Sequence, residues 1–255
     1  MKKTHQVALV AVLLLATMFA TQECQSQTAA PAAPAGTPAP AAAPAAAATG
    51  VKATVKFSGA GPVMPKLKRE ADPFCGKTPM NDQEVVINAN GTLKNTVVRV
   101  SQGAAAVATP PADAKEVDQN NCMYAPRVVV GVTGQKVLIK NTDPIMHNVH
   151  TYQGTTTGFN QAQMKGSKDL EKTLAAGLMK FKCDVHPWMT GYTYGNDNPY
   201  VCVTDDKGEC NLGDIPAGTY TIETWHEKLG VKTAPLTVTA GTPASVEISY
   251  AGAAQ

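Results

Sequence analysis

Four residues of this 255-residue sequence combine side-chain types that bind soft metal ions. Cys183, His186 and Met189 lie within one short stretch after a predicted strand, and His147 lies upstream at the end of another predicted strand. A thiolate and two imidazoles with a weak thioether are the ligands of an electron-transfer copper site, because the sulfur ligands suit Cu(I) and imidazole suits both oxidation states. The spacing therefore predicts one copper ion. Zinc also binds two His and one Cys, although it rarely takes a methionine ligand.

The two segments that carry these residues resemble the cupredoxin family, and its amicyanin- and plastocyanin-like members in particular. Cys183-x-x-His186-x-x-Met189 has the spacing of the short amicyanin ligand loop, and the His-Asn-Val-His string that begins at His147 is similar to its first ligand segment. The resemblance implies a type 1 site with His147 and His186 as imidazole ligands, Cys183 as the thiolate and Met189 as the axial ligand. It also implies that Asn148 hydrogen-bonds the two ligand segments together.

Further residues around these segments are expected to support the site. Residues three apart in a strand point to opposite faces, so His150 is expected to lie outside the ligand set, behind the site or at the surface. Trp188 is expected beside an exposed edge of His186, and Pro187 and Trp188 are predicted to form a docking patch. His226, in a Trp-His-Glu string, is interpreted as a packing or capping residue.

Six cysteines in a chain with an export signal predict disulfides. Cys202 and Cys210 flank a tight turn and can face each other across a hairpin. Cys75 and Cys122 both lie in irregular segments and form the other natural pair. This count leaves Cys183 as a thiol among histidines, although a bond between Cys183 and Cys122 is an alternative.

The N-terminal residues read as a leader and a tether. Residues 1–23 have the basic start and the apolar run (residues 7–19) of a secretory signal, which predicts a periplasmic protein. Cys24 follows as the acylated cysteine of a bacterial lipoprotein does, but Thr21-Gln22-Glu23 is a poor lipobox, so both outcomes stay open. Residues 24–50 are rich in Ala and Pro and are expected to form an extended spacer.

The remaining sequence predicts an all-β fold. Period-two alternation, rich in Val and Ile, recurs in ten short segments, and only residues 160–175 look helical or irregular. The predicted strands are 51–57, 84–88, 96–100, 127–132, 136–140, 179–183, 200–204, 219–225, 236–239 and 245–250.

Two sandwiches are expected from this series. Residues 51–197 are predicted to form a cupredoxin-like Greek-key β-sandwich, and residues 198–250 a small transthyretin-like or carboxypeptidase-regulatory-like β-sandwich. The second assignment is a resemblance, based on Gly213-Asp-Ile-Pro-Ala-Gly-Thr-Tyr-Thr-Ile and Trp225-His226-Glu227. Bacterial proteins of the methylamine-utilisation type carry a similar domain. Whether the first strand pairs with this domain or with the cupredoxin-like sheet stays open.

The predicted function is that of a periplasmic one-electron carrier with one type 1 copper ion, and not of an enzyme. The formal net charge is only +2 and no basic run occurs, which argues against nucleic-acid binding. Expected partners are periplasmic redox proteins, such as a c-type cytochrome or a dehydrogenase, that exchange electrons through the edge of His186. A monomer is expected, with membrane contact only through a lipid on Cys24. The alternatives are a copper-handling or sensing module and a metal-free interaction or glycan-binding sandwich.

Overall fold

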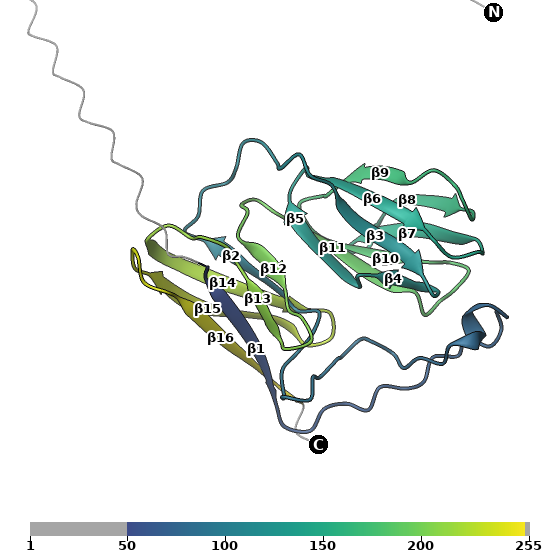
Figure 1. Cartoon of the computed structure of the whole chain (residues 1–255), viewed down its shortest axis with the longest axis horizontal. Helices are drawn as coiled ribbons and strands as arrows, with labels where there is room; N and C mark the ends of the chain where they lie inside the picture. The colour runs from purple at the N-terminus through teal and green to yellow at the C-terminus, as the bar shows by residue number, and fades with distance from the viewer. Residues whose placement is uncertain (1–49, 253–255) are drawn as a thin grey trace, which may run out of the picture. The chain divides into compact units, whose positions relative to one another are not determined.

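The described residues form β-strands and loops, which confirms the predicted all-β class (Figure 1). This computed structural model describes residues 50–252, and all of them lie in one of the two units into which the chain divides, residues 43–255. The predicted leader (residues 1–23) and all but the last residue of the predicted tether (residues 24–50) lie outside the described residues. Within residues 50–252, no helix is long and apolar enough to cross a membrane.

The first sandwich is built from nine strands between residues 115 and 196. One sheet has the order β5-β11-β10-β7-β8 and the other the order β4-β3-β6-β9. Alternate β-branched and aromatic side chains of both sheets are buried between them, which is what the period-two pattern requires. The strands are β3 (Lys115–Asn120), β4 (Met123–Ala125), β5 (Val128–Val132), β6 (Lys136–Asn141), β7 (His147–Gln153), β8 (Thr156–Gln163), β9 (Leu170–Thr173), β10 (Gly177–Lys182) and β11 (Thr190–Asn196).

The second sandwich is built from strands at both ends of the described chain. Its sheets have the orders β13-β1-β16 and β12-β2-β14-β15. Its core is a separate cluster of Val, Ile, Leu, Phe and Tyr side chains. The strands are β1 (Lys52–Ser58), β2 (Val97–Gln102), β12 (Val201–Val203), β13 (Glu209–Asn211), β14 (Gly218–His226), β15 (Gly230–Val238) and β16 (Ser245–Ala251).

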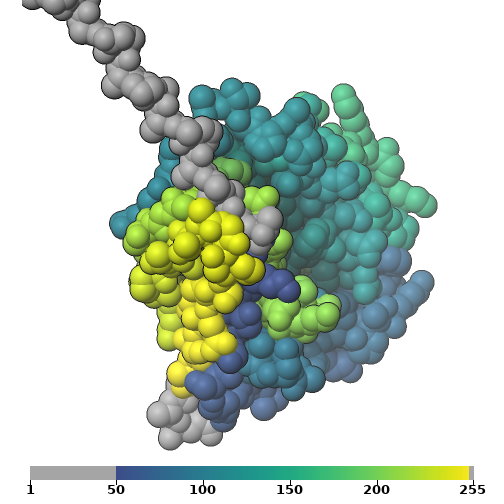
Figure 2. Space-filling model, turned by 60° about the vertical axis from the view of Figure 1, so that its left-hand side comes forward, coloured from purple at the N-terminus to yellow at the C-terminus, as the bar shows by residue number. Residues whose placement is uncertain are grey.

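This pairing corrects the predicted domain boundary at residue 197. β1 runs parallel to β16 along its whole length, from the pair Lys52 and Ser245 onward, and β2 lies between β12 and β14. In Figure 2 the purple β1 lies beside the yellow β16. The alternation of buried and exposed residues in β1 fixes which face is buried. It does not fix the partner strand, since that partner lies almost two hundred residues away.

Two local predictions were also wrong. Residues 84–88 do not form a strand; Ile87 makes only an isolated bridge to Leu93. Residues 160–175, expected to be helical or irregular, contain the end of β8 and all of β9. Both faces of β8 are mostly exposed and polar, so its sequence lacks the alternation by which strands are recognised.

A long excursion between β1 and β2 reaches the first sandwich (Figure 1). Its central part, residues 65–82, is called the capping segment here. Backbone hydrogen bonds from Leu67 to Met80 and from Asp82 to Pro65 close the base of this segment. Near its tip, the 3₁₀ turn η1 (Cys75–Lys77) is joined to the β3–β4 turn by the Cys75–Cys122 disulfide. The predicted pairs Cys75–Cys122 and Cys202–Cys210 are both confirmed.

The two sandwiches meet across a small buried junction. Val97, Val128 and Tyr192 form an apolar cluster there, against which Trp225 packs. Beside it lies a buried ion pair in which Arg127 donates through Nε and Nη2 to both carboxylate oxygens of Glu227. The hydroxyl of Tyr192 donates to the same carboxylate over 3.0 Å. The junction thus joins the segment before β5 to the end of β14.

Candidate metal centre

Three buried side chains of the predicted ligand set converge where β7 begins and β10 ends. His147, Cys183 and His186 expose 0%, 1% and 2% of their surfaces, and one donor atom of each lies within 4.8 Å of the others. The two Nδ1 atoms of His147 and His186 are 2.9 Å apart, and Cys183 Sγ lies 3.7 Å from His186 Nδ1. Both imidazoles therefore direct Nδ1 toward the sulfur and leave Nε2 for other partners.

Strand pairing explains why residues so far apart in sequence meet here. β7 and β11 both flank β10, and Lys182 at the end of β10 is paired with His150 on one side and Thr190 on the other. The start of β7 is thereby placed beside the loop of residues 183–189. A backbone hydrogen bond of 2.9 Å from Met189 to His186 closes this loop into a turn.

Met189 and Trp188 lie on the same loop. The side chain of Met189 is fully buried in the apolar cluster that also contains Cys183. The rings of Trp188 and His186 have centroids 5.2 Å apart, and the indole Nε1–H donates to the backbone oxygen of Cys122. The loop is therefore anchored at its end by an apolar contact and a hydrogen bond.

Asn148 lies between the two ligand segments. Its Oδ1 accepts a hydrogen bond of 2.7 Å from the backbone N–H of Asp184, and its own backbone N–H points to Cys183 Sγ at 3.5 Å. These contacts join the start of β7 to the loop at the position of the thiol. They also supply a donor to the sulfur, which favours the thiolate.

His150 faces away from the three converging side chains. Its Nδ1 lies 3.0 Å from Asp184 and 2.9 Å from the hydroxyl of Tyr152, with Asn160 nearby. Asp184 also accepts from the side chain of Asn148. His150 thus belongs to a polar network behind the thiol and not to the converging set.

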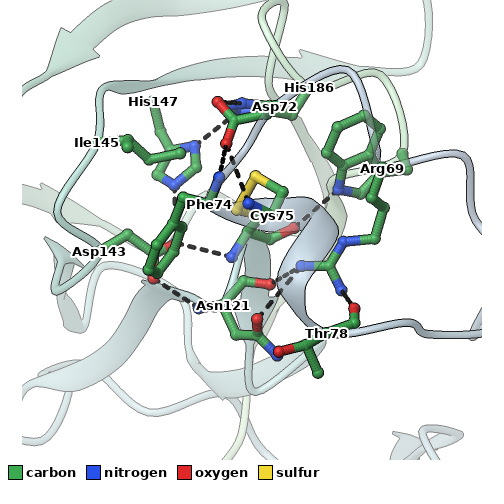
Figure 3. Close-up of a disulfide and its surroundings, with 12 residues drawn as sticks. Arg69, Asp72, Phe74, Cys75, Thr78, Asn121, Asp143, Ile145, His147 and His186 are labelled. Atoms are coloured by element: carbon green, nitrogen blue, oxygen red, sulfur yellow. Dashed lines mark hydrogen bonds and ion pairs between the residues drawn. A yellow bond between two sulfur atoms is a disulfide. The ribbon is translucent and has the colours of Figure 1, made fainter.

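Two carboxylates that the sequence did not indicate hold the outer nitrogens of the imidazoles (Figure 3). Asp143 lies 2.8 Å from Nε2 of His147, and Asp72 lies 3.4 Å from Nε2 of His186. A carboxylate on the outer nitrogen fixes the ring orientation and the tautomer of a ligand histidine. Asp143 stands close to His147 in sequence, which is a weak signal, whereas Asp72 is 114 positions from His186 and gives none.

The electrostatics of this group favour a thiolate beside a charged imidazole when no metal is bound. Burial lowers the pKa of His147, but Asp143 and Cys183 outweigh it and raise this pKa to about 9. Burial raises the pKa of Cys183, but His147 and backbone N–H groups outweigh it and lower this pKa. Burial, together with the charge on His147, lowers the pKa of His186 despite the opposing effect of Asp72. His186 is therefore neutral and accepts the Nδ1–H of His147.

Two other groups of candidate ligands overlap this one. Each combines a histidine and a carboxylate with Cys75 or Cys122. Both of these sulfurs are consumed in the disulfide, so they are not available as thiolates. Among the described residues, Cys183 is the one cysteine without a disulfide partner.

The expected exposed edge of His186 is not present. The capping segment covers this ring, and Asp72 takes the nitrogen that would otherwise face solvent. An open groove of about 620 Å³ lies beside it, lined by residues of the capping segment and of the ligand loop. Those residues are Lys68, Ala71, Asp72, Val185, His186, Pro187 and Trp188.

His226 lies outside this group, at the end of β14 in the second sandwich. It is buried, and its Nδ1 accepts hydrogen bonds from the backbone N–H groups of Lys228 and Leu229. Burial, and then the charge of Arg127, lowers the pKa of His226 to about 4. The structure thus places it as a capping residue.

The buried His226 predicts a loss of stability in mild acid. The pKa of His226 in the folded protein lies below the ordinary value of 6.5. As the pH falls, the unfolded chain therefore takes up the proton first. The associated stability is present above pH 6.5 and is lost as the pH falls toward 4. From pH 7 to pH 5 this group alone lowers the free energy of unfolding by about 2 kcal/mol.

Urea unfolding of the metal-free protein at both pH values measures this loss. His226→Asn is the matched variant, because its Oδ1 accepts the same two N–H groups without titrating. The pH dependence should be smaller in the variant by the stated amount. An equal dependence in both proteins would show that His226 is not the group responsible.

No protein-family model matches the sequence, and no curated protein matches it. Solved structures similar to part of the chain include a purple cupredoxin from Nitrosopumilus maritimus, with 19% identity over 32% of this chain and 99% of that one, at a TM-score of 0.29. Amicyanin from Paracoccus versutus shows 24% identity over 39% of this chain and 97% of that one, at a TM-score of 0.30. A copper-containing nitrite reductase from Thermus scotoductus SA-01 shows 20% identity over 39% of this chain but only 25% of that one, at a TM-score of 0.30.

Proposed function

We propose that this protein binds one type 1 copper ion and carries single electrons, without turning over a substrate. The observation that supports the proposal is the convergence of His147, Cys183 and His186, with both Nδ1 atoms directed toward the sulfur. A thiolate with two imidazoles is the donor set of such a site. Met189, buried on the same loop, supplies the thioether of the set.

The state of the donors fits a copper ion. When bound, copper in such a set cycles between Cu(I) and Cu(II) and so takes up or gives up one electron. The pKa of Cys183 is lowered, which favours the thiolate, and the pKa of His186 is lowered, which favours the neutral ring. His147 must lose the proton on Nδ1 before it can bind a metal, so loading releases a proton.

The surrounding strands make the donors rigid. His147 is paired with Gln163 of β8, β7 is paired with β10 from His150 onward, and the loop that carries the other donors leads into β11. Asn148 fixes the distance between the two segments. Rigid donors reduce the rearrangement that accompanies a change of charge at the site, which favours electron transfer over chemistry on a substrate.

A partner protein is proposed to dock at the groove beside the ligand loop. Val185 and Pro187 are exposed there, and Trp188 and His186 both line the groove. The partner would be a soluble redox protein of the periplasm, such as a c-type cytochrome or a dehydrogenase. The same proposal includes export directed by residues 1–23. It also includes a tether formed by residues 24–50, a lipid on Cys24 and a monomeric state.

Electron carriage is preferred to an enzymatic role. Outside the converging set, the histidines within residues 50–252 are His150 and His226. Neither belongs to a group of three possible ligands in the described part of the chain. An oxidase or nitrite reductase would need a further copper centre with its own histidines.

A visible absorption spectrum and a paramagnetic-resonance spectrum of the Cu(II)-loaded protein test the proposal. We expect an intense thiolate-to-copper band, because a deprotonated Cys183 is the donor. Cys183→Ala should remove this band, and His226→Asn, which lies in the other sandwich, should keep it. A reversible one-electron wave in voltammetry would separate a carrier from a copper-handling module.

Two results would count against this function. One is a protein that stays colourless after loading with Cu(II). The other is a band that survives Cys183→Ala. Metal analysis of the protein from its native compartment would identify a metal-free interaction protein, or a zinc protein, directly.

A further inference from the structure

The Cys75–Cys122 disulfide lies against both ligand histidines through a pair of carboxylates (Figure 3). On one side, the backbone N–H of Cys75 donates over 3.0 Å to Oδ1 of Asp72, and the N–H of Phe74 donates to the same oxygen. The other oxygen of Asp72 faces Nε2 of His186. One half of the disulfide is thus two contacts away from a candidate ligand.

The other half repeats this arrangement. The backbone N–H of Cys122 donates over 2.7 Å to Oδ2 of Asp143, and the N–H of Asn121 donates over 2.7 Å to Oδ1. Oδ2 of Asp143 also faces Nε2 of His147 at 2.8 Å. Each half-cystine therefore donates its own N–H to the carboxylate that contacts one of the two imidazoles.

The turn that carries Cys122 depends on these contacts. Asn121 and Cys122 form the two-residue turn between β3 and β4, with φ values of 50° and 53°. Hairpin turns of two residues favour positive φ, but a cysteine adopts it at a conformational cost. Asp143 accepts hydrogen bonds from both N–H groups of the turn. The disulfide links the turn to η1.

A buried arginine fastens the capping segment to the same turn. Arg69 exposes only 1% of its surface, and its guanidinium donates to the backbone oxygens of Thr78 and Asn121. The indole N–H of Trp188 donates to the backbone oxygen of Cys122 in the same turn. The capping segment, the β3–β4 turn and the ligand loop are thus joined at the disulfide.

We propose that the Cys75–Cys122 disulfide is an external clamp of the metal centre. It holds Asp72 and Asp143 at the outer nitrogens of His186 and His147 and so keeps both Nδ1 atoms directed inward before metal arrives. Asp72 and Asp143 are positioning residues in this scheme. The identity of the metal rests on the proposed function, but the orientation of the imidazoles does not.

Copper affinity of the full chain tests the clamp, measured as competition with a Cu(I) chelator. Loss of a group that supports a ligand costs roughly 10–100-fold in metal affinity. We expect a loss in this range for Asp72→Asn and for Asp143→Asn. The double variant Cys75→Ser/Cys122→Ser should lose a similar factor, although it leaves every ligand and both carboxylates in the sequence.

Matched controls come from the second sandwich. Asp205 accepts backbone N–H groups from Lys207 and Glu209 over 2.8 and 3.0 Å, as Asp72 does from its own neighbours, so Asp205→Asn is the control for a carboxylate. Cys202→Ser/Cys210→Ser is the control for a disulfide. Both should keep wild-type affinity within about twofold, a small fraction of the loss expected at the clamp. Wild-type affinity in Cys75→Ser/Cys122→Ser would overturn the clamp, even if that variant melts earlier.

Imidazole nitrogen and proton spectra of the metal-free protein provide a readout that needs no copper. In the wild type, the Nε2–H groups of His147 and His186 should exchange slowly with solvent, and in Cys75→Ser/Cys122→Ser they should exchange fast. Slow exchange in both proteins would contradict the clamp. If the wild type binds no copper, the proposed function fails, and these spectra still decide the present proposal.

Discussion

Replacement of Glu227 by Gln should lower the free energy of unfolding by about 3–5 kcal/mol, because it leaves a buried guanidinium without its counter-ion. The side chains of Arg127 and Glu227 expose only 4% and 7% of their surfaces. The two-point contact between them lies at the junction of the two sandwiches, and Tyr192 donates to the same carboxylate. Glu227→Gln therefore leaves the guanidinium screened from solvent, with the backbone oxygen of Thr190 as a neutral acceptor. Denaturant unfolding of the metal-free protein at pH 7 measures the effect.

The pair of Arg99 and Glu223 is the natural control. Arg99 also uses Nε and Nη2, although both contact Oε1 of Glu223. Each side chain exposes 22% of its surface, so Glu223→Gln should cost no more than about 1 kcal/mol. The double variant Arg127→Met/Glu227→Leu should recover most of the loss, since apolar replacement removes the unpaired charge. A cost of Glu227→Gln similar to that of Glu223→Gln would show that Arg127 finds water or another partner.

Removal of the Cys75–Cys122 disulfide should cost about 4 kcal/mol of unfolding free energy, and removal of Cys202–Cys210 about 2.6 kcal/mol. The reason lies in the unfolded chain, whose freedom a cross-link reduces more when the closed loop is longer. The two bonds join residues 47 and 8 positions apart. Cys75→Ser/Cys122→Ser and Cys202→Ser/Cys210→Ser, compared by thermal and denaturant unfolding, give the two values.

The better test is which of the two disulfides costs more unfolding free energy to remove. Contacts that are lost around Cys122, such as those of Asp143 and Trp188, add to the cost of opening the longer loop. A larger cost for the short loop would mean that the unfolded state keeps the capping segment near the β3–β4 turn without the bond. Measurement of the variants without metal separates this effect from copper binding.

The predictable parts of the fold are those that depend on local pattern. Alternating residues identified β1, β2, β5, β6 and several other strands of the second sandwich, and the positions of the cysteines beside turns and in irregular segments predicted both disulfides. The spacing from Cys183 to His186 and Met189 is local as well, because a single loop carries all three.

The parts that could not be predicted depend on partners far away in the sequence. β1 shows which of its faces is buried but carries no signal that its neighbour is β16. In the sequence, Asp72 lies in a turn-rich stretch, where an exposed carboxylate is expected. Only the folded capping segment brings it to His186. The same segment covers His186. This burial could not be predicted, because nothing near residues 183–189 indicates that a distant loop closes over them.

The order of strands has a further consequence for the architecture of the centre. β2 and β12 pair directly, with Arg99 opposite Val201, and the entire first sandwich is inserted between them. Insertion between neighbouring strands is tolerated because the two ends of the insert leave the host close together. The capping segment, however, belongs to the second sandwich, which is the host, because it lies in the chain between β1 and β2. The inserted domain therefore carries the donors, while the host supplies Asp72 and half of the disulfide. Excised alone, the insert would keep Cys183 and both imidazoles and would expose His186.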